Sequence, residues 1–336
     1  MQNFAIANWR AERPWLADTI VCDGLLPWAN DFLPPGASLA EQLRRFAANG
    51  VDHVSLTAAA GNEGTAAALA RLGLLRRELR AHGDFVSIAA DNEGIKNAKA
   101  NGKLSVSFHF QSATAFANDL DLVDAFYGAG VRRAILAYNE ANAFADGCHE
   151  ARNAGLSASG RKLVERMDRV GMLVDISHCG ERTSFDAMEA PLSRAPIFSH
   201  SNARALYAHE RNITDEQIRA CARRGGYIGI NGVGFFLGAV GADIPVAMAE
   251  HAAHIAGIAG AERIGLGLDF MFLEQSDYGF FHRAKGRWPR GYPEPPWSFL
   301  QPEQFGDLVL SLEKKGFDRN ELKGVLGGNY LRLANA

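Results

Sequence analysis

Two similar stretches of sequence decide the predicted fold: Leu173-Val174-Asp175-Ile176-Ser177-His178 and Pro196-Ile197-Phe198-Ser199-His200. Each begins as a short apolar run and ends in Ser-His. Between them, Thr183–Ala190 has the spacing of apolar residues that is typical of a helix. The two histidines are 22 residues apart, about the length of one strand–helix–strand step. The two runs are therefore predicted to be neighbouring parallel strands that end at the same edge of a sheet.

The same alternation of strand and helix extends in both directions along the chain. Runs that are apolar on both faces, as in a parallel sheet covered by helices, occur at Thr19–Val21, Val51–Leu56, Phe85–Ile88, Leu104–Phe110, Arg133–Ala137, Leu173–Ile176, Ile197–Ser199, Tyr227–Asn231 and Ile264–Leu268. Helical stretches occur at Ser38–Asn49, Gly64–His82, Leu120–Ala129, Ser159–Val170, Thr183–Ala190, Thr214–Arg224 and Val246–Ala259. Eight or nine such units in one register predict a closed (β/α)₈ barrel, the TIM-barrel class of α/β fold.

No linker, repeat or low-complexity tract divides the chain, so one barrel domain is predicted over residues 1–336. The irregular region is 275–302, which is rich in Gly, Pro and aromatic residues. A long loop of this kind is predicted to be a wall of the active site or a contact between subunits rather than a domain boundary. Its aromatic residues Trp288, Tyr292, Trp297 and Phe299 fit either role.

Composition excludes several classes of protein. The 35 Lys and Arg against 38 Asp and Glu give a net charge of −3, whereas a general nucleic-acid binder needs a basic surface. No run approaches the ~20 apolar residues of a membrane helix. Charged residues and a proline interrupt Met1–Trp15, where a signal peptide would have its apolar core. The four cysteines are far apart and form no Cys-x-x-Cys pair, which favours free thiols. We therefore expect a soluble, cytoplasmic protein.

Polar residues follow five of the predicted strands, where a (β/α)₈ barrel carries its reactive groups. They are His178, His200, Asp269, Gln111 and the pair Tyr138-Asn139. Two imidazoles side by side at a barrel mouth can share a divalent ion at ~2.0–2.1 Å each. Alternatively, each histidine is a hydrogen-bonded residue that ends a strand. Asp269 is interpreted as a neighbour of the metal or a proton acceptor, with a structural salt bridge as the alternative.

The ordered motifs resemble the membrane (renal) dipeptidase family, the M19 metallopeptidases. They are Asp175-Ile176-Ser177-His178, Phe198-Ser199-His200-Ser201, Arg211-Asn212 and Gly267-Leu268-Asp269-Phe270, with Gly155-Leu156-Ser157 and Gly328-Asn329-Tyr330-Leu331-Arg332 also similar. The resemblance implies a (β/α)₈ barrel in which typical members hold two zinc ions bridged by a glutamate and a hydroxide. It implies that His178 and His200 are ligands of one zinc. Asp269 would be the acid/base, and Arg211 would clamp the terminal carboxylate of a dipeptide.

The chain departs from the family pattern at the other metal position. Asp23 stands where typical members have the first histidine ligand, and Leu25 stands where they have an aspartate. Gln111 replaces the bridging glutamate, and Tyr138 replaces the histidine that polarises the substrate carbonyl. Losing two anionic ligands predicts one Zn²⁺ rather than two, because bridging anions normally offset the repulsion between paired cations. Asp23 and Gln111 then remain candidate helpers for His178 and His200.

These observations predict a metal-dependent hydrolase that cleaves the amide bond of a dipeptide or a similar small amide carrying a carboxylate. Asp269 and Tyr138 are the predicted catalytic residues, and Arg211 and Tyr138 are predicted to bind the substrate. One alternative is a catalytically silent barrel that binds a small acid without metal through Arg211 and Tyr138. Another is a cysteine hydrolase at Cys148, next to His149.

Two further expectations concern neighbours of these residues and assembly. His109 lies two residues before Gln111 and so points to the same side of one strand. It is either a substitute ligand or a packed strand histidine. Family members often form dimers, which makes a homodimer through the 275–302 segment an expectation for this chain.

Overall fold

The eight strands of the structure run parallel where they pair. The computed structural model describes residues 9–28, 33, 36–273, 278–283 and 291–333. The strands are β1 (Cys22–Leu26), β2 (His53–Ala59), β3 (Val86–Ile88), β4 (Leu104–Phe110), β5 (Val131–Ile135), β6 (Leu173–Asp175), β7 (Ile228–Ile230) and β8 (Ile264–Leu266). Hydrogen bonds join them in the order β1-β2-β4-β5-β6, with β7 beside β8 and β3 beside β4.

Three local links complete the ring of strands. Single parallel bridges, Asp175 to Ile197 and Phe198 to Ile228, insert the 197–198 segment between β6 and β7. The Asp269 amide donates to the Leu25 carbonyl at 3.0 Å, which joins the chain after β8 to β1. The barrel therefore has eight strand positions, in the order β1, β2, β4, β5, β6, 197–198, β7, β8. The predicted (β/α)₈ barrel is confirmed.

Two predicted strands differ from the observed ones. Thr19–Val21 precedes β1, because pairing with β2 begins only at Cys22, which lies opposite His53. The strand predicted at Phe85–Ile88 forms as β3, but it pairs with the amino-terminal half of β4 while β5 pairs with the other half. β3 therefore lies beside the barrel and is not one of its eight strands.

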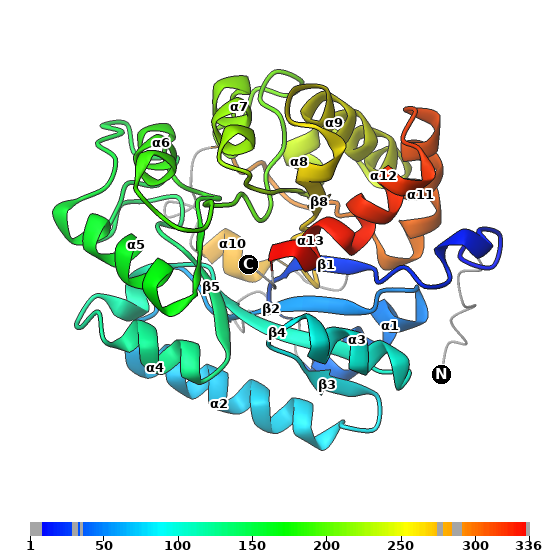
Figure 1. Ribbon diagram of the computed structural model, residues 1–336, viewed down its shortest axis with the longest axis horizontal. Helices are drawn as coiled ribbons and strands as arrows, with labels where there is room; N and C mark the ends of the chain where they lie inside the picture. The colour runs from blue at the N-terminus through cyan, green and yellow to red at the C-terminus, as the bar shows by residue number, and fades with distance from the viewer. Residues whose placement is uncertain (1–8, 29–32, 34–35, 274–277, 284–290, 334–336) are drawn as a thin grey trace.

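Helices surround the strands (Figure 1). They are α1 (Leu39–Ala48), α2 (Thr65–Ala81), α3 (Asn92–Ala100), α4 (Leu122–Gly128), α5 (Ala158–Val170), α6 (Glu181–Glu189), α7 (Asp215–Arg223), α8 (Gly234–Leu237), α9 (Ile244–Ala259), α10 (Gly279–Arg283), α11 (Phe305–Lys314), α12 (Arg319–Lys323) and α13 (Asn329–Leu333). In Figure 1, α2 and α4 lie along one side of the sheet and α7 and α9 along the other, while α13 crosses in front of the strands and α10 lies behind them. Every helix predicted from the sequence is present.

The predicted helix starts have the expected capping bonds. The Thr214 side chain accepts from the Gln217 amide and the Gln217 side chain returns to the Thr214 amide, which is a complete capping box. Ser38 accepts from the Glu41 amide at the start of α1. Each such cap contributes about 1 kcal/mol to helix stability.

The expected absence of a membrane helix and of disulfides can be compared with the described part of the chain. None of the described helices has the length and apolar composition needed to cross a bilayer. Cys22, Cys148, Cys179 and Cys221 are all free, as predicted.

Candidate active site

A pair of buried histidines lies at the carboxyl-terminal mouth of the barrel. His178 follows β6 and His200 follows the 197–198 segment, so the two histidines follow neighbouring strands of the barrel, as predicted. Their Nε2 atoms face each other at 2.8 Å, with the ring centroids 4.8 Å apart. The strand–helix–strand spacing in the sequence therefore does bring the two rings together.

Hydrogen bonds on the far side of each ring determine which nitrogen faces the partner. His178 Nδ1 lies 2.7 Å from the Asn139 side-chain oxygen, an acceptor, so Nδ1 carries the proton and Nε2 presents its lone pair. His200 Nδ1 lies 2.7 Å from the Ser199 hydroxyl, which can donate or accept. His200 can therefore donate its Nε2 proton to His178, or present a second lone pair while Ser199 accepts from its Nδ1.

Burial keeps both imidazoles neutral. Desolvation lowers the pKa of His178 and of His200 well below the usual value, and the nearby positive charge of Arg211 lowers both further. A neutral imidazole is the form that binds a metal ion, since its lone pair is not occupied by a proton. The pair is thus in the chemical state of a ligand at neutral pH.

Asp269 lies in the same mouth, directly after the β8 strand. Its carboxylate accepts a hydrogen bond from the Asn231 side chain at 3.2 Å. Burial raises the pKa of Asp269 to about 6, although Arg211 and the Asn231 hydrogen bond oppose the shift. A carboxylate with a pKa close to neutrality can both take and return a proton, which suits acid/base catalysis.

The Arg211 guanidinium supplies the positive charge of the site. Its side chain is 3% exposed, Nη2 donates to the His200 carbonyl at 3.1 Å, and the guanidinium carbon lies 5.3 Å from the centre of the Phe236 ring. Its Nε has no hydrogen-bond partner among the described residues. A buried cation with an unused donor can receive a carboxylate.

Tyrosine rings form the wall beside His178. The Tyr138 ring stacks on the His178 ring, with the centroids 4.0 Å apart and the planes at 25°. Burial, with Tyr292 and Asp269 nearby, raises the pKa of Tyr138 well above its usual value, so its hydroxyl stays a donor. Tyr292 continues the wall and accepts a long hydrogen bond from the Asn139 amide at 3.5 Å.

Aromatic side chains from the described part of the 275–302 segment pack against this wall. Tyr292 and Trp297 contact Phe235, with ring centroids 5.2 and 5.3 Å apart, and Phe299 is buried. The two predicted roles of the segment, a wall of the active site or a contact between subunits, stay predictions. Trp288 lies outside the described residues.

Asp23 has a structural role in the described structure. Its Oδ1 accepts from the Leu25 amide at 3.0 Å and from the Leu268 amide at 2.8 Å, which ties β1 to the end of β8. Its Oδ2 has no hydrogen-bond partner among the described residues. Burial is the main cause that raises the pKa of Asp23 to about 7; the two backbone hydrogen bonds oppose the rise, and the nearby Asp269 contributes to it.

Gln111 also forms a hydrogen bond within the protein. Its Nε2 donates to the Thr57 hydroxyl at 2.9 Å, and that hydroxyl lies 3.0 Å from His109 Nε2. His109 is fully buried and its Nδ1 contacts the Ser55 hydroxyl, as expected of a packed strand histidine. Within the described ranges, no three His, Cys, Asp or Glu side chains are grouped to hold a metal ion. The donor set that the structure assembles is the pair His178 and His200, and metal binding by Asp23 and Gln111 stays a prediction.

Cys148 is placed close to the site but is not activated. Its Sγ lies 3.4 Å from the Asn139 side-chain oxygen. Burial raises the pKa of the Cys148 thiol to about 11, so the thiolate needed for nucleophilic attack is not populated at neutral pH. The cysteine-hydrolase alternative therefore lacks support.

The structure adds two amides and an ion pair that sequence reasoning did not assign. Asn139 holds His178, and Asn231 holds Asp269. Both amides stand at strand ends, a signal that was available in the sequence. Beneath the histidines, Arg133 pairs with Asp175 at 3.0 Å, and Asp175 accepts from the backbone amides of Ser177 and Ser199.

Backbone strain marks the same mouth. Asn139, His178 and Asp269 have φ values of 62°, 63° and 54°, in the left-handed region that side chains other than glycine rarely adopt. Such strain is retained where the surrounding structure enforces it, and it concentrates at functional sites. Three strained strand ends converging on one mouth support the assignment of the site.

Comparisons with known proteins agree with this geometry. A family model described as "Membrane dipeptidase (Peptidase family M19)" matches residues 36–288. Similar curated proteins include an uncharacterized dipeptidase of Schizosaccharomyces pombe, 34% identical over 212 residues that cover 62% of this chain and 47% of that protein. Dipeptidase 3 of Mus musculus is 28% identical over 274 residues, covering 79% and 50%. The chain thus spans about half the length of these relatives.

Solved structures show the same fold. An amidohydrolase from Pseudomonas aeruginosa is 27% identical, with a TM-score of 0.84 over 96% of this chain and 97% of that one. A metallopeptidase from Rhodobacter sphaeroides, solved with a phosphinate mimic of the dipeptide L-Ala-D-Ala, is 19% identical, with a TM-score of 0.75 over 94% and 99%. At that lower identity the likeness concerns the fold alone.

Proposed function

Because the chain belongs to the membrane dipeptidase family (peptidase family M19), we propose that it is a metal-dependent hydrolase that cleaves the amide bond of a dipeptide or a similar small amide carrying a carboxylate. The observation that carries the proposal is the convergence of the His178 and His200 Nε2 atoms beside Asp269 and Arg211. Metal-assisted amide hydrolysis needs neutral imidazoles as ligands, a carboxyl with a pKa near neutrality and a buried cation to bind the substrate.

The histidine pair fits one zinc ion. Two Zn–N bonds of ~2.0–2.1 Å at a tetrahedral angle would separate the nitrogens by about 3.3 Å. The observed 2.8 Å would have to open by about 0.5 Å, with the Ser199 hydroxyl accepting from His200 Nδ1 so that Nε2 presents its lone pair. A bound zinc would lower the pKa of a water towards ~7 and polarise the scissile carbonyl. For a second ion, no group of three or more His, Cys, Asp or Glu side chains is present among the described residues.

Asp269 would handle the protons of the reaction. With its pKa raised to about 6, it is mainly a carboxylate at neutral pH and can accept a proton from the attacking water. The protonated side chain can then give that proton to the leaving amine. Asn231 holds one carboxylate oxygen in place through its 3.2 Å hydrogen bond.

Arg211 and Tyr138 would position the substrate. The unused Nε of the buried Arg211 guanidinium would bind the free carboxylate, which restricts substrates to short acids. The protonated Tyr138 hydroxyl would donate to the substrate carbonyl, in place of the histidine of typical family members. The aromatic residues of the described loop would limit the depth of the mouth.

We also propose a cytoplasmic location, which the four free cysteines support, since exported proteins more often carry disulfides. The homodimer remains an expectation from the resemblance.

A second candidate is a catalytically silent barrel that binds a small acid through Arg211. The observation that favours it is the lack, among the described residues, of a third metal-binding side chain grouped with the histidines. Two neutral ligands bind a divalent ion more weakly than a set that includes a carboxylate or thiolate.

Hydrolysis assays with matched substrates distinguish the two candidates. We expect zinc-loaded protein to hydrolyse free-acid dipeptides, to lose activity with a chelator and to regain it with zinc. Blocking the substrate carboxylate as an amide should lower kcat/KM about 10- to 100-fold, because Arg211 loses its charged partner. His178→Ala should be inactive, while the exposed Arg219→Gln should match wild type. Dipeptide binding with no turnover at any zinc concentration would favour the silent barrel, and turnover in His178→Ala would exclude the metal mechanism.

A further inference from the structure

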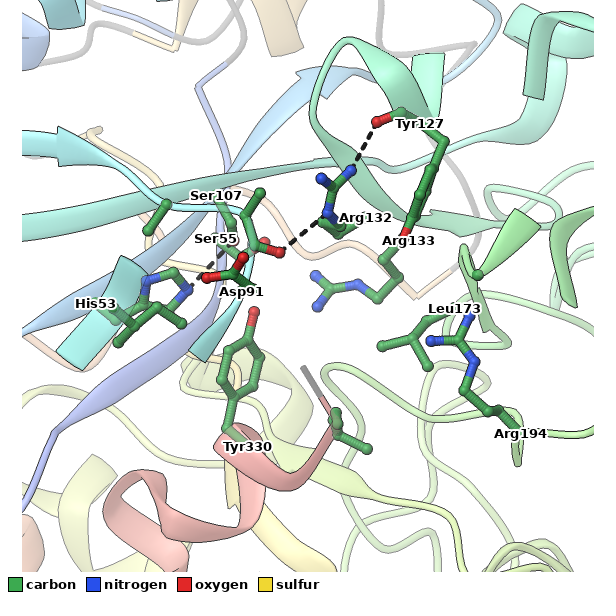
Figure 2. A pocket seen from close by; sticks show the side chains of 15 residues that line it. His53, Ser55, Asp91, Ser107, Tyr127, Arg132, Arg133, Leu173, Arg194 and Tyr330 are labelled. Atoms are coloured by element: carbon green, nitrogen blue, oxygen red, sulfur yellow. Dashed lines mark hydrogen bonds between the residues drawn. The ribbon is translucent and has the colours of Figure 1, made fainter. Parts of the chain in front are cut away.

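A separate cavity lies at the amino-terminal end of the barrel, opposite the histidine pair. It has a volume of about 170 Å³. Its lining comes from the beginnings of β2 and β6, from β5, from the loop before α3 and from α13 (Figure 2). Because the barrel strands are parallel, this mouth is remote from the strand ends that carry His178 and His200. The proposed function leaves this cavity unexplained.

Three hydrogen-bond donors that line the cavity have no partner in the described part of the chain. Tyr330 is 8% exposed, and its hydroxyl has no hydrogen-bond partner there. Arg133 is 3% exposed; its Nε lies 3.0 Å from the Asp175 carboxylate without forming a hydrogen bond, its Nη2 donates to the Gly24 carbonyl, and its Nη1 has no hydrogen-bond partner there. Arg132 uses Nε for the Ala90 carbonyl and Nη1 for the Tyr127 carbonyl, which leaves Nη2 unused. In Figure 2 the Arg133 guanidinium and the Tyr330 hydroxyl point towards the middle of the cavity.

One guanidinium at the cavity has no ion-pair partner among the described residues. Arg132 is anchored by neutral carbonyls, and no carboxylate among the described residues forms an ion pair with it. His53 is neutral, because burial lowers its pKa to about 3. The acid in the described lining is Asp91, an exposed residue whose Oδ1 accepts from the Gly94 amide at the start of α3.

We infer that this cavity is a binding site for a small oxyanion, of the phosphate or carboxylate class. Unused donors from Arg132, Arg133 and Tyr330 require acceptors, and an oxyanion offers several acceptors together with a negative charge for the Arg132 guanidinium. The volume equals that of about six water molecules at ~30 Å³ each. It is below the ~300 Å³ of pockets for drug-sized ligands, so the ligand is small.

The site is joined to the barrel interior by the buried ion pair. Arg133 contacts Asp175 at 3.0 Å, and Asp175 accepts from the Ser177 and Ser199 amides, which immediately precede the two histidines. An anion on Arg133 would therefore add negative charge to a network that already supports the histidine strands. The binding site itself does not depend on the proposed hydrolase activity.

Calorimetric titration of chelator-treated protein tests the inference. Inorganic phosphate and succinate are titrated separately in chloride buffer at constant ionic strength, so that zinc and general screening do not contribute. We expect one saturable site per chain for at least one of the two anions. Arg132→Gln should weaken it about 10- to 100-fold, the usual effect of losing a hydrogen bond to a charged group. Tyr330→Phe, which keeps the ring that packs on His53, should weaken it about 10-fold.

Controls make each outcome decisive. Arg219→Gln removes the same charge from an exposed position on α7 and should leave binding unchanged. Thermal unfolding without anion verifies that each variant is folded, and Tyr330→Phe decides the matter if Arg132→Gln does not fold. Failure of both anions to bind wild type would overturn the inference. So would binding that stays unchanged in folded Arg132→Gln and Tyr330→Phe, because the anion would then occupy another place, such as Arg211.

Discussion

Replacing Asp23 by Asn should change how stability depends on pH. The Asp23 carboxyl is buried where β1 meets the end of β8, and its Oδ2 has no hydrogen-bond partner among the described residues. Burial raises its pKa in the folded protein to about 7, from 3.8 for an exposed aspartate. Asn keeps the Oδ1 acceptor for the Leu25 and Leu268 amides but cannot ionise.

The sign and the size follow from proton linkage. Below pH 3.8 the group is protonated in both states, and its full contribution to stability is present. Between pH 3.8 and about 7 the folded protein holds a proton that the unfolded chain has lost, so stability falls as pH rises. At ~1.36 kcal/mol per pKa unit, the shift corresponds to a loss of about 4 kcal/mol. Above pH 7 the loss should level off.

Denaturant unfolding of chelator-treated wild type and Asp23→Asn, from pH 4 to pH 8, measures this effect. Other buried groups, including the histidines, titrate in both proteins, so the wild-type value minus the variant value isolates Asp23. We expect this difference in the free energy of unfolding to fall by about 4 kcal/mol across the range. A difference that is flat, or that rises with pH, would refute the assignment of a buried, unpaired carboxyl.

Three further predictions concern the candidate active site. Asn139→Gly tolerates the left-handed backbone but removes the acceptor for His178, so it should weaken zinc binding about 10- to 100-fold in a competition titration. Asn139→Asp keeps that acceptor and should bind zinc as wild type does. Equal zinc affinities of the two variants would contradict the orienting role of Asn139. The kcat/KM of hydrolysis should increase as pH rises through about 6, because Asp269 must lose its proton to act as a base. Asp269→Asn should lower kcat about 10²- to 10⁴-fold. A pH-independent kcat/KM would argue against Asp269 as the base. Cys148→Ser should retain turnover, and a loss of activity comparable to that of Asp269→Asn would revive the cysteine mechanism.

Much of the barrel could be predicted from the sequence because its elements have strong local signals. β4 and the helices α5 and α7 form within one residue of the predicted ranges. The first strand was displaced, because Cys22-Asp23-Gly24 has a low intrinsic preference for strands. Long-range packing overrides that preference: a Cβ atom on Gly24 would lie 2.8 Å from the Leu266 carbonyl oxygen, so the close approach of β1 to β8 requires glycine.

The strand order was less accessible to prediction. Val86–Ile88 has the composition of a barrel strand, and no local pattern distinguishes a strand of the barrel from a strand added beside β4. The short 197–198 segment forms only one bridge to each neighbouring strand.

The candidate active site was likewise predictable only in part. His178, His200 and Asp269 follow recognisable strand runs, so the barrel topology alone predicts that they share a mouth. The partners that orient them, Asn139 and Asn231, depend on side-chain contacts across 39 and 38 residues of sequence. Such contacts follow from the closed barrel and have no local pattern of their own.

Metal analysis of protein purified without chelator tests the central claim most directly. Wild type is compared with His178→Ala and His200→Ala, each shown to be folded by circular dichroism. We predict about one zinc per wild-type chain and none in either variant, because the two Nε2 atoms act together. Zinc retained at the same ratio in both folded variants, or absent from wild type even after dialysis against zinc, would contradict the account.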